Sequence, residues 1–225
     1  MACWFNSDDA TLSQFLMGIS SENDYAYHHF GLWADGSVAG DPIKADTYDG
    51  TSAVAASTSG FSANTWHHAC AVWSATNARA AYIDGGSKGT DTTSCTPASL
   101  DNVTIAALYR WAGASNLVGA SLMSGSIAEA AVWNAALTDA EVAMLALGLS
   151  PLLIRPANLA GYWPLIRDED RDRAGDYHMT AYNTPSIATH PPKLKPWWLR
   201  PWTLRRAAAA PPATRRSQLM MLGVG

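Results

Sequence analysis

Two segments about 40 residues apart constrain the fold of this 225-residue chain more than any other feature. The earlier one, Trp66–Gly86, holds two runs whose side chains alternate with a period of two. The polar stretch 74–77 separates the runs, and Asp84-Gly85 closes the second. Alternation across a polar turn predicts a β-hairpin, and Asp-Gly supplies the positive φ angle of a tight turn. We therefore expect a central hairpin with strands at 66–73 and 78–83.

The later segment, Gly125–Leu145, predicts a strand followed by a short helix. Residues 127–133 form a strand-like run with small side chains on one face, and an Asn-Ala-Ala-Leu turn follows. Thr138 and Glu141 then match a capping box, in which each side chain accepts a hydrogen bond from the other residue's backbone N–H. A helix at about 139–147, ending near Gly148, is the expected result.

In this order the two segments resemble the core of laminin G-like and pentraxin-like domains, which are concanavalin A-like jelly rolls. The resemblance covers roughly residues 2–187 and departs from the pattern at Val72, Ala75 and Ala128. It is specific for the fold, whereas the same sandwich hosts lectins, adhesion modules and hydrolases. The matching positions are His68, Cys70 and Trp73 in the earlier segment, and Gly125, Ile127, Glu129, Trp133, Asn134, Ala136, Leu137 and Glu141 in the later one.

The expected fold is all-β: a jelly-roll sandwich of two antiparallel sheets with one short helix and an irregular C-terminal tail rich in Pro, Trp and Arg. We place the sandwich at 1–187 and the tail at 188–225. Relatives carry one more strand before the run at 2–5, so the first strand is expected to be missing, and either the start is truncated or another strand fills its place. Neither a signal-peptide pattern nor about 18 consecutive apolar residues is present, so no membrane contact is expected.

The tail differs from the body in charge. All 19 acidic residues precede Ser186, where they outnumber eight basic residues and give the body a net charge of −11, while seven basic residues lie beyond it without an acid. Because its charge complements the body and its tryptophans are too apolar to be left in water, we expect the tail to dock. The expected partner is the protein's own body, another subunit of an oligomer or another virion protein, with nucleic acid the least expected. The docking residues are Trp197, Trp198, Arg200, Trp202, Arg205 and Arg206.

Pro- and Arg-rich endings after a laminin G-like domain resemble those of tailed-bacteriophage structural proteins. The resemblance implies a virion component, either a capsid decoration or a tail or fibre protein, that contacts surface glycans or neighbouring subunits. Two alternatives stay open. One is a glycan-active hydrolase on the same fold, and the other is an extracellular calcium-dependent lectin whose signal peptide has been lost.

Catalysis is not expected. Hydrolases of this superfamily carry Glu-x-Asp-x-x-Glu on one strand, where period-two spacing points the carboxylates into one cleft. The nearest match is Glu22–Tyr27, in which Tyr27 replaces the final carboxylate and leaves the pair incomplete. We therefore expect a binding or structural module and assign no catalytic residue.

The resemblance also implies candidate ligand sites. Calcium is the one candidate cofactor, because loops of this fold often offer hard oxygen ligands; the candidates here are Asp84, Asn102 and Glu129. Cys3 and Cys70 fall where pentraxins place a disulfide, and the alternative is two buried thiols on neighbouring strands. A sugar ring stacks on an exposed aromatic beside polar groups. The aromatic candidates are Tyr25, Tyr27, Trp33, Tyr48, Tyr109 and Trp111. The residues assigned to sugar binding are Trp33, Tyr109, Trp111 and Asn116.

Overall fold

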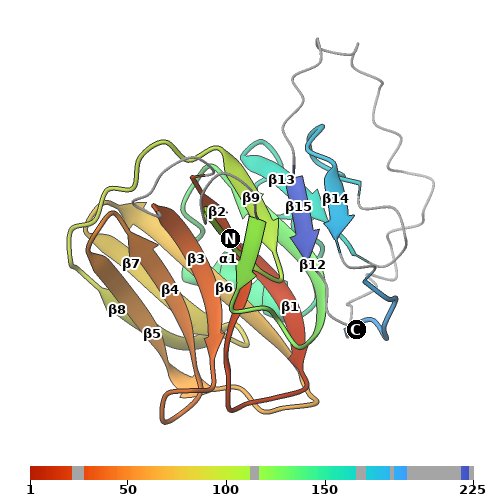
Figure 1. The fold of residues 1–225 in the computed structure, drawn as a ribbon, viewed down its shortest axis with the longest axis horizontal. Helices are drawn as coiled ribbons and strands as arrows, with labels where there is room; N and C mark the ends of the chain where they lie inside the picture. The colour runs from red at the N-terminus through yellow and green to blue at the C-terminus, as the bar shows by residue number, and fades with distance from the viewer. Residues whose placement is uncertain (22–27, 112–116, 166–170, 183–184, 192–218, 223–225) are drawn as a thin grey trace.

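Two β-sheets lie face to face in the computed structural model, which describes residues 1–21, 28–111, 117–165, 171–182, 185–191 and 219–222 (Figure 1). The six-stranded sheet has the order β13 (Leu159–Trp163), β12 (Gly125–Trp133), β1 (Ala2–Ser7), β6 (Trp66–Ala75), β7 (Ala78–Ile83), β8 (Gly86–Asp91). The seven-stranded sheet has the order β14 (Met179–Tyr182), β15 (Leu219–Leu222), β9 (Asn102–Ile105), β2 (Ser13–Ser20), β3 (His29–Asp35), β4 (Pro42–Tyr48), β5 (Ser52–Gly60).

Neighbouring strands pair antiparallel throughout both sheets except at β15, which runs parallel to β9 and to β14. A separate hairpin joins β10 (Leu108–Trp111) to β11 (Leu117–Ala120). The predicted all-β sandwich is therefore confirmed, with one parallel strand that the jelly-roll expectation did not include.

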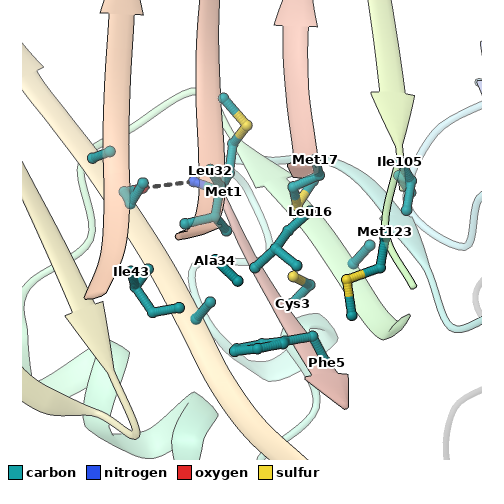
Figure 2. Close-up of a cluster of buried hydrophobic side chains, with 14 of the residues drawn as sticks. Met1, Cys3, Phe5, Leu16, Met17, Leu32, Ala34, Ile43, Ile105 and Met123 are labelled. Atoms are coloured by element: carbon teal, nitrogen blue, oxygen red, sulfur yellow. Dashed lines mark hydrogen bonds between the residues drawn. The ribbon is translucent and has the colours of Figure 1, made fainter. Parts of the chain in front are cut away.

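The main core lies between the sheets. Figure 2 shows Cys3 and Phe5 from the six-stranded sheet beside Leu16, Leu32 and Ile43 from the seven-stranded sheet, and all five side chains are fully buried. Their positions follow from period-two alternation, which sends every second side chain of a strand inward. Fully burying such side chains stabilises the fold by roughly 1.5–3 kcal/mol each.

A second apolar cluster covers the outer face of the six-stranded sheet. Here α1 (Asp139–Ala146) places Val142 and Leu145 against Tyr82 and Trp133. The predicted capping box is present: the Thr138 side chain accepts a hydrogen bond from the Glu141 N–H, and the Glu141 side chain accepts one from the Thr138 N–H. The predicted helix and its start are confirmed, and a short 3-10 helix, η1 (Pro151–Leu153), follows.

The predicted central hairpin is confirmed as β6 and β7. The next turn, between β7 and β8, has positive φ angles at Asp84 (50°) and Gly85 (77°). Within this hairpin Arg79 is buried, and its guanidinium donates to the Asp91 carboxylate of β8 and to the backbone carbonyls of Thr76 (3.0 Å) and Thr93 (2.7 Å). This buried cation fastens β8 and the segment after it to the hairpin.

Of the two alternatives left open for Cys3 and Cys70, the structure has two buried thiols and not a disulfide. Strand register gives the reason: Ala2 lies opposite Cys70 and Cys3 opposite Ala69, so the two cysteines are offset by one residue and point to opposite faces of the sheet. Cys3 lies in the core between the sheets and Cys70 in the cluster under the helix, both as free thiols. Burial raises the pKa of Cys70 to about 11.

At the start of the chain, β1 is paired on both sides, by β12 and β6, so this strand has no open edge. At the other end, the predicted tail contains β15, which is part of the seven-stranded sheet. The six docking residues proposed between 197 and 206 lie outside the described residues.

Candidate functional site

A groove of about 470 Å³ lies on the outer face of the seven-stranded sheet. Strands β3 and β4 form most of it, because their alternation sends Leu32 and Ile43 inward and leaves the intervening side chains outside. Pairing sets these outer side chains beside one another, since Trp33 faces Lys44 and His29 faces Tyr48. The groove is lined by Ser13, His29, Trp33, Asp35, Lys44, Asp46, Tyr48, Ser52 and Val54.

Glycines make room for the aromatic floor. A Cβ atom on Gly31 would lie 2.6 Å from the Trp33 Nε1 atom, and one on Gly18 would lie 2.4 Å from the Phe15 ring. Phe15 and Trp33 pack edge to face with ring centroids 4.9 Å apart. Trp33 is only 9% exposed, so it offers the groove little of its ring.

Two carboxylates of the groove are held by cationic or imidazole partners. The Asp46 carboxylate lies 3.0 Å from the His29 Nε2 atom and accepts a hydrogen bond from the Ser52 hydroxyl at 3.2 Å. His29 in turn stacks on Tyr48, with ring centroids 5.9 Å apart and planes within 16°. The result is a fixed row of imidazole, carboxylate and hydroxyl beside the Tyr48 ring.

Asp35 forms the other charged end of the groove. Its carboxylate accepts hydrogen bonds from the Lys44 ammonium and from the Ser37 hydroxyl, the latter at 2.6 Å. Partial burial alone would raise the pKa of Asp35, but the hydrogen bonds from Lys44 and Ser37 and the charge of Lys44 outweigh it and hold the pKa below its ordinary value. Asp35 is therefore an ionised hydrogen-bond acceptor at neutral pH and a poor proton donor.

The sequence identified two groove residues, Trp33 and, among its wider set of aromatic candidates, Tyr48. Tyr109 and Trp111 lie on β10, whose first residue Leu108 packs against Phe15 and Trp33, and Asn116, like Tyr25 and Tyr27, lies outside the described residues. The missed groove residues come from β2, β3, β4 and β5, and β4, which carries Lys44 and Asp46, was not predicted as a strand. The alternation of Lys44, Asp46 and Tyr48 with buried residues was the signal that could have found this strand.

The calcium candidates do not form one site. The Asp84 carboxylate is occupied by the His67 Nδ1 atom (2.8 Å) and by the His68 N–H (2.8 Å), so it braces the hairpin turn. Glu129 is buried, accepts from the Tyr162 hydroxyl at 2.6 Å and lies 3.1 Å from the His190 Nε2 atom. Strands β1 and β6 separate β12, which holds Glu129, from β7, and Asn102 belongs to the other sheet.

Within the described part of the chain, no group of three or more His, Cys, Asp and Glu side chains is placed to hold a metal ion. Calcium binding stays a prediction. In the same part of the chain, no helix is long and apolar enough to cross a membrane.

Comparison with known proteins agrees with the topology. No curated protein matches the chain. Among solved structures, it is similar to a Bacteroides ovatus protein described as a candidate carbohydrate-binding protein, with a TM-score of 0.54 and 20% sequence identity over 78% of this chain and 49% of the other. This chain thus spans about half the length of that protein. A heptameric SAP-like pentraxin from Limulus polyphemus gives a TM-score of 0.46 and 13% identity over 64% of this chain and 67% of the pentraxin.

A family model provides the assignment. The model describing the concanavalin A-like lectin/glucanases superfamily, in its laminin G form, matches residues 1–143, which is more than half of the chain. The match spans the groove strands β2 to β5 and the central hairpin. The chain therefore belongs to the laminin G-like family of the concanavalin A-like lectin/glucanases superfamily.

Proposed function

We propose that this chain is a non-enzymatic carbohydrate-binding module that holds its ligand in the groove across β3 and β4. The observation that carries the proposal is the row formed by Tyr48, His29, Asp46 and Ser52, with Lys44 and Asp35 beside it. Family membership and the description of the Bacteroides ovatus protein point in the same direction.

The chemistry of the row suits a sugar. A pyranose ring presents an apolar face, which can stack on Tyr48, and hydroxyl groups that need both donors and acceptors. The Lys44 ammonium has further N–H groups to donate, while the Ser52 hydroxyl oxygen and the carboxylates of Asp46 and Asp35 can accept. Because each carboxylate already has a partner, it is oriented before the ligand arrives, which lowers the entropy lost on binding.

The same contacts argue against glycoside hydrolysis in this groove. Hydrolysis needs one carboxylic acid that is protonated at working pH and gives its proton to the leaving oxygen. The pKa of Asp35 is instead held below its ordinary value by Lys44 and Ser37. Binding without turnover is the function that this charge arrangement favours.

Truncating Tyr48 to alanine is expected to weaken glycan binding about tenfold, since a lost aromatic stacking contact removes roughly 0.5–1.5 kcal/mol beyond the buried area. A glycan array on the intact chain selects the ligand, and titration calorimetry then measures its affinity for both proteins. The matched control is Tyr177→Ala, because Tyr177 is 51% exposed and lies outside the groove. Equal affinities of the Tyr48 variant and the parent, or release of new reducing ends from the bound glycan, would contradict the proposal.

The proposal extends to location: we place the chain in a tailed-bacteriophage virion, as a decoration, tail or fibre component. Its support is the charge division between an acidic body and a Pro- and Arg-rich C-terminal region. Mass spectrometry of purified particles is expected to find the chain at a fixed stoichiometry. Recovery of the chain only from the particle-free fraction would refute this location and leave the glycan-binding proposal standing.

A further inference from the structure

The last described strand of the chain lies inside a sheet. β15 lies between β9 and β14 (Figure 1), pairing Leu219–Leu222 with Met179–Tyr182 on one side and Met220 and Met221 with Thr104 and Ile105 on the other. It runs parallel to both neighbours, so no tight turn can connect it to either of them. The 36 residues from 183 to 218 separate it from β14.

The place that β15 fills is a strand-acceptor slot. On its walls, Ile105 of β9 and Met179 of β14 are buried members of the main core. Without β15, β9 would keep only β2 as a partner and would present a row of unpaired backbone N–H and C=O groups. Such an edge accepts an extended segment through main-chain hydrogen bonds, and Leu-Met-Met-Leu supplies four apolar residues for it.

We propose that in an oligomer of this protein the slot is filled by Leu219–Leu222 of a second copy of the chain. The contacts inside the slot are identical whether the strand belongs to the same copy or to its neighbour. The two arrangements differ only in the path of the segment that connects β14 to β15. Residues 192–218 number 27 and can span up to about 90 Å when extended, which is enough to reach an adjacent subunit.

Charge favours the neighbour as the donor. Residues 192–218 carry seven Lys and Arg and no acid, whereas the body before Ser186 has a net charge of −11. Two such bodies repel each other when they meet. A basic segment that crosses from each copy to the other places positive charge between the two acidic surfaces and offsets that repulsion. This inference concerns assembly and does not depend on the glycan proposal.

A disulfide between β9 and β15 distinguishes insertion of a neighbour's strand from insertion of the chain's own strand. Thr104 and Met220 are register partners, and the spacing of paired strands, about 4.8 Å, suits a disulfide between cysteines at these positions. One chain carrying Thr104→Cys is mixed with another carrying Met220→Cys, the mixture is unfolded, refolded and oxidised, and covalent dimers are measured on a non-reducing gel. The three native cysteines are buried, and the parent chain controls for them.

Insertion of a neighbour's strand predicts a covalent dimer containing one chain of each kind, together with an oligomer by light scattering that becomes monomeric when residues 219–225 are removed. The matched control mixes the Met220→Cys chain with a Val38→Cys chain, whose exposed cysteine lies away from the slot and should not cross-link. A disulfide that forms only when both cysteines are in the same chain would overturn the proposal, and so would the absence of any disulfide at this pair.

Discussion

Replacing Asp91 with alanine is expected to lower the free energy of unfolding by about 3 kcal/mol. Arg79 is buried, and Asp91 is the carboxylate that its guanidinium contacts. Removing that carboxylate leaves a buried cation whose remaining hydrogen-bond acceptors are the carbonyls of Thr76 and Thr93. We place the effect at the lower end of the range for broken buried pairs, because the Asp91 side chain is 22% exposed and water can partly replace it.

Denaturant unfolding at pH 7 measures this effect. The control is Lys88→Ala, which breaks the exposed ion pair between Lys88 and Asp139 and should cost less than 1 kcal/mol. A double variant, Arg79→Met with Asp91→Ala, should recover part of the loss because no buried charge remains. If the Asp91 variant lost no more stability than the Lys88 variant, the pair would not be the fastening of β8 that we describe.

Acid is expected to destabilise the sandwich through His68, well above the pH at which most carboxylates titrate. His68 is fully buried and packs edge to face on Trp4, with ring centroids 5.6 Å apart. Burial lowers the pKa of His68 to about 4, against about 6.5 in the unfolded chain. Between these values the unfolded state binds more protons, so stability is complete above about pH 6.5 and falls as the pH drops toward 4. The whole loss is about 3 kcal/mol.

The comparison that isolates His68 uses His68→Gln, which cannot titrate. Between pH 7 and pH 4.5 the parent should lose about 2 kcal/mol more unfolding free energy than this variant, because carboxylates titrate alike in both proteins. The exposed His178 gives the control, since His178→Gln should follow the parent at both pH values. Parallel losses in the parent and the His68 variant would show that His68 is protonated in the folded state as easily as in the unfolded state.

Local signals made much of the fold predictable. The hairpin of β6 and β7, the turn after it and the start of α1 were found because the alternation across 74–77, Asp84-Gly85 and the capping box of Thr138 and Glu141 each act within a few residues. The sequence left the state of Cys3 and Cys70 open for a physical reason. The resemblance indicates the strand on which each cysteine lies, whereas the register of strand pairing, set by contacts along the whole strand, decides which face of the sheet it occupies.

The groove was harder to predict for the same physical reason. Its residues come from β2, β3, β4 and β5, and a sequence does not say which strands become neighbours. Trp33 was found because an aromatic is a visible sugar-binding candidate, while Lys44 and Asp46 look like ordinary surface charges until His29 and Asp35 are placed beside them. β15 is four residues long, too short to carry a periodic pattern, and its partners precede it by 36 residues or more.

The position of β15 after a long connection has a consequence for synthesis. At about 5–20 residues per second, translation of the 36 residues between β14 and β15 takes roughly 2–7 s. During that interval both walls of the slot have already been made and the strand that fills it has not. Each nascent sandwich therefore has an open slot while other copies of the chain are being made on the same messenger RNA. Which copy's β15 enters the slot then depends on the order in which these strands emerge from their ribosomes as well as on affinity.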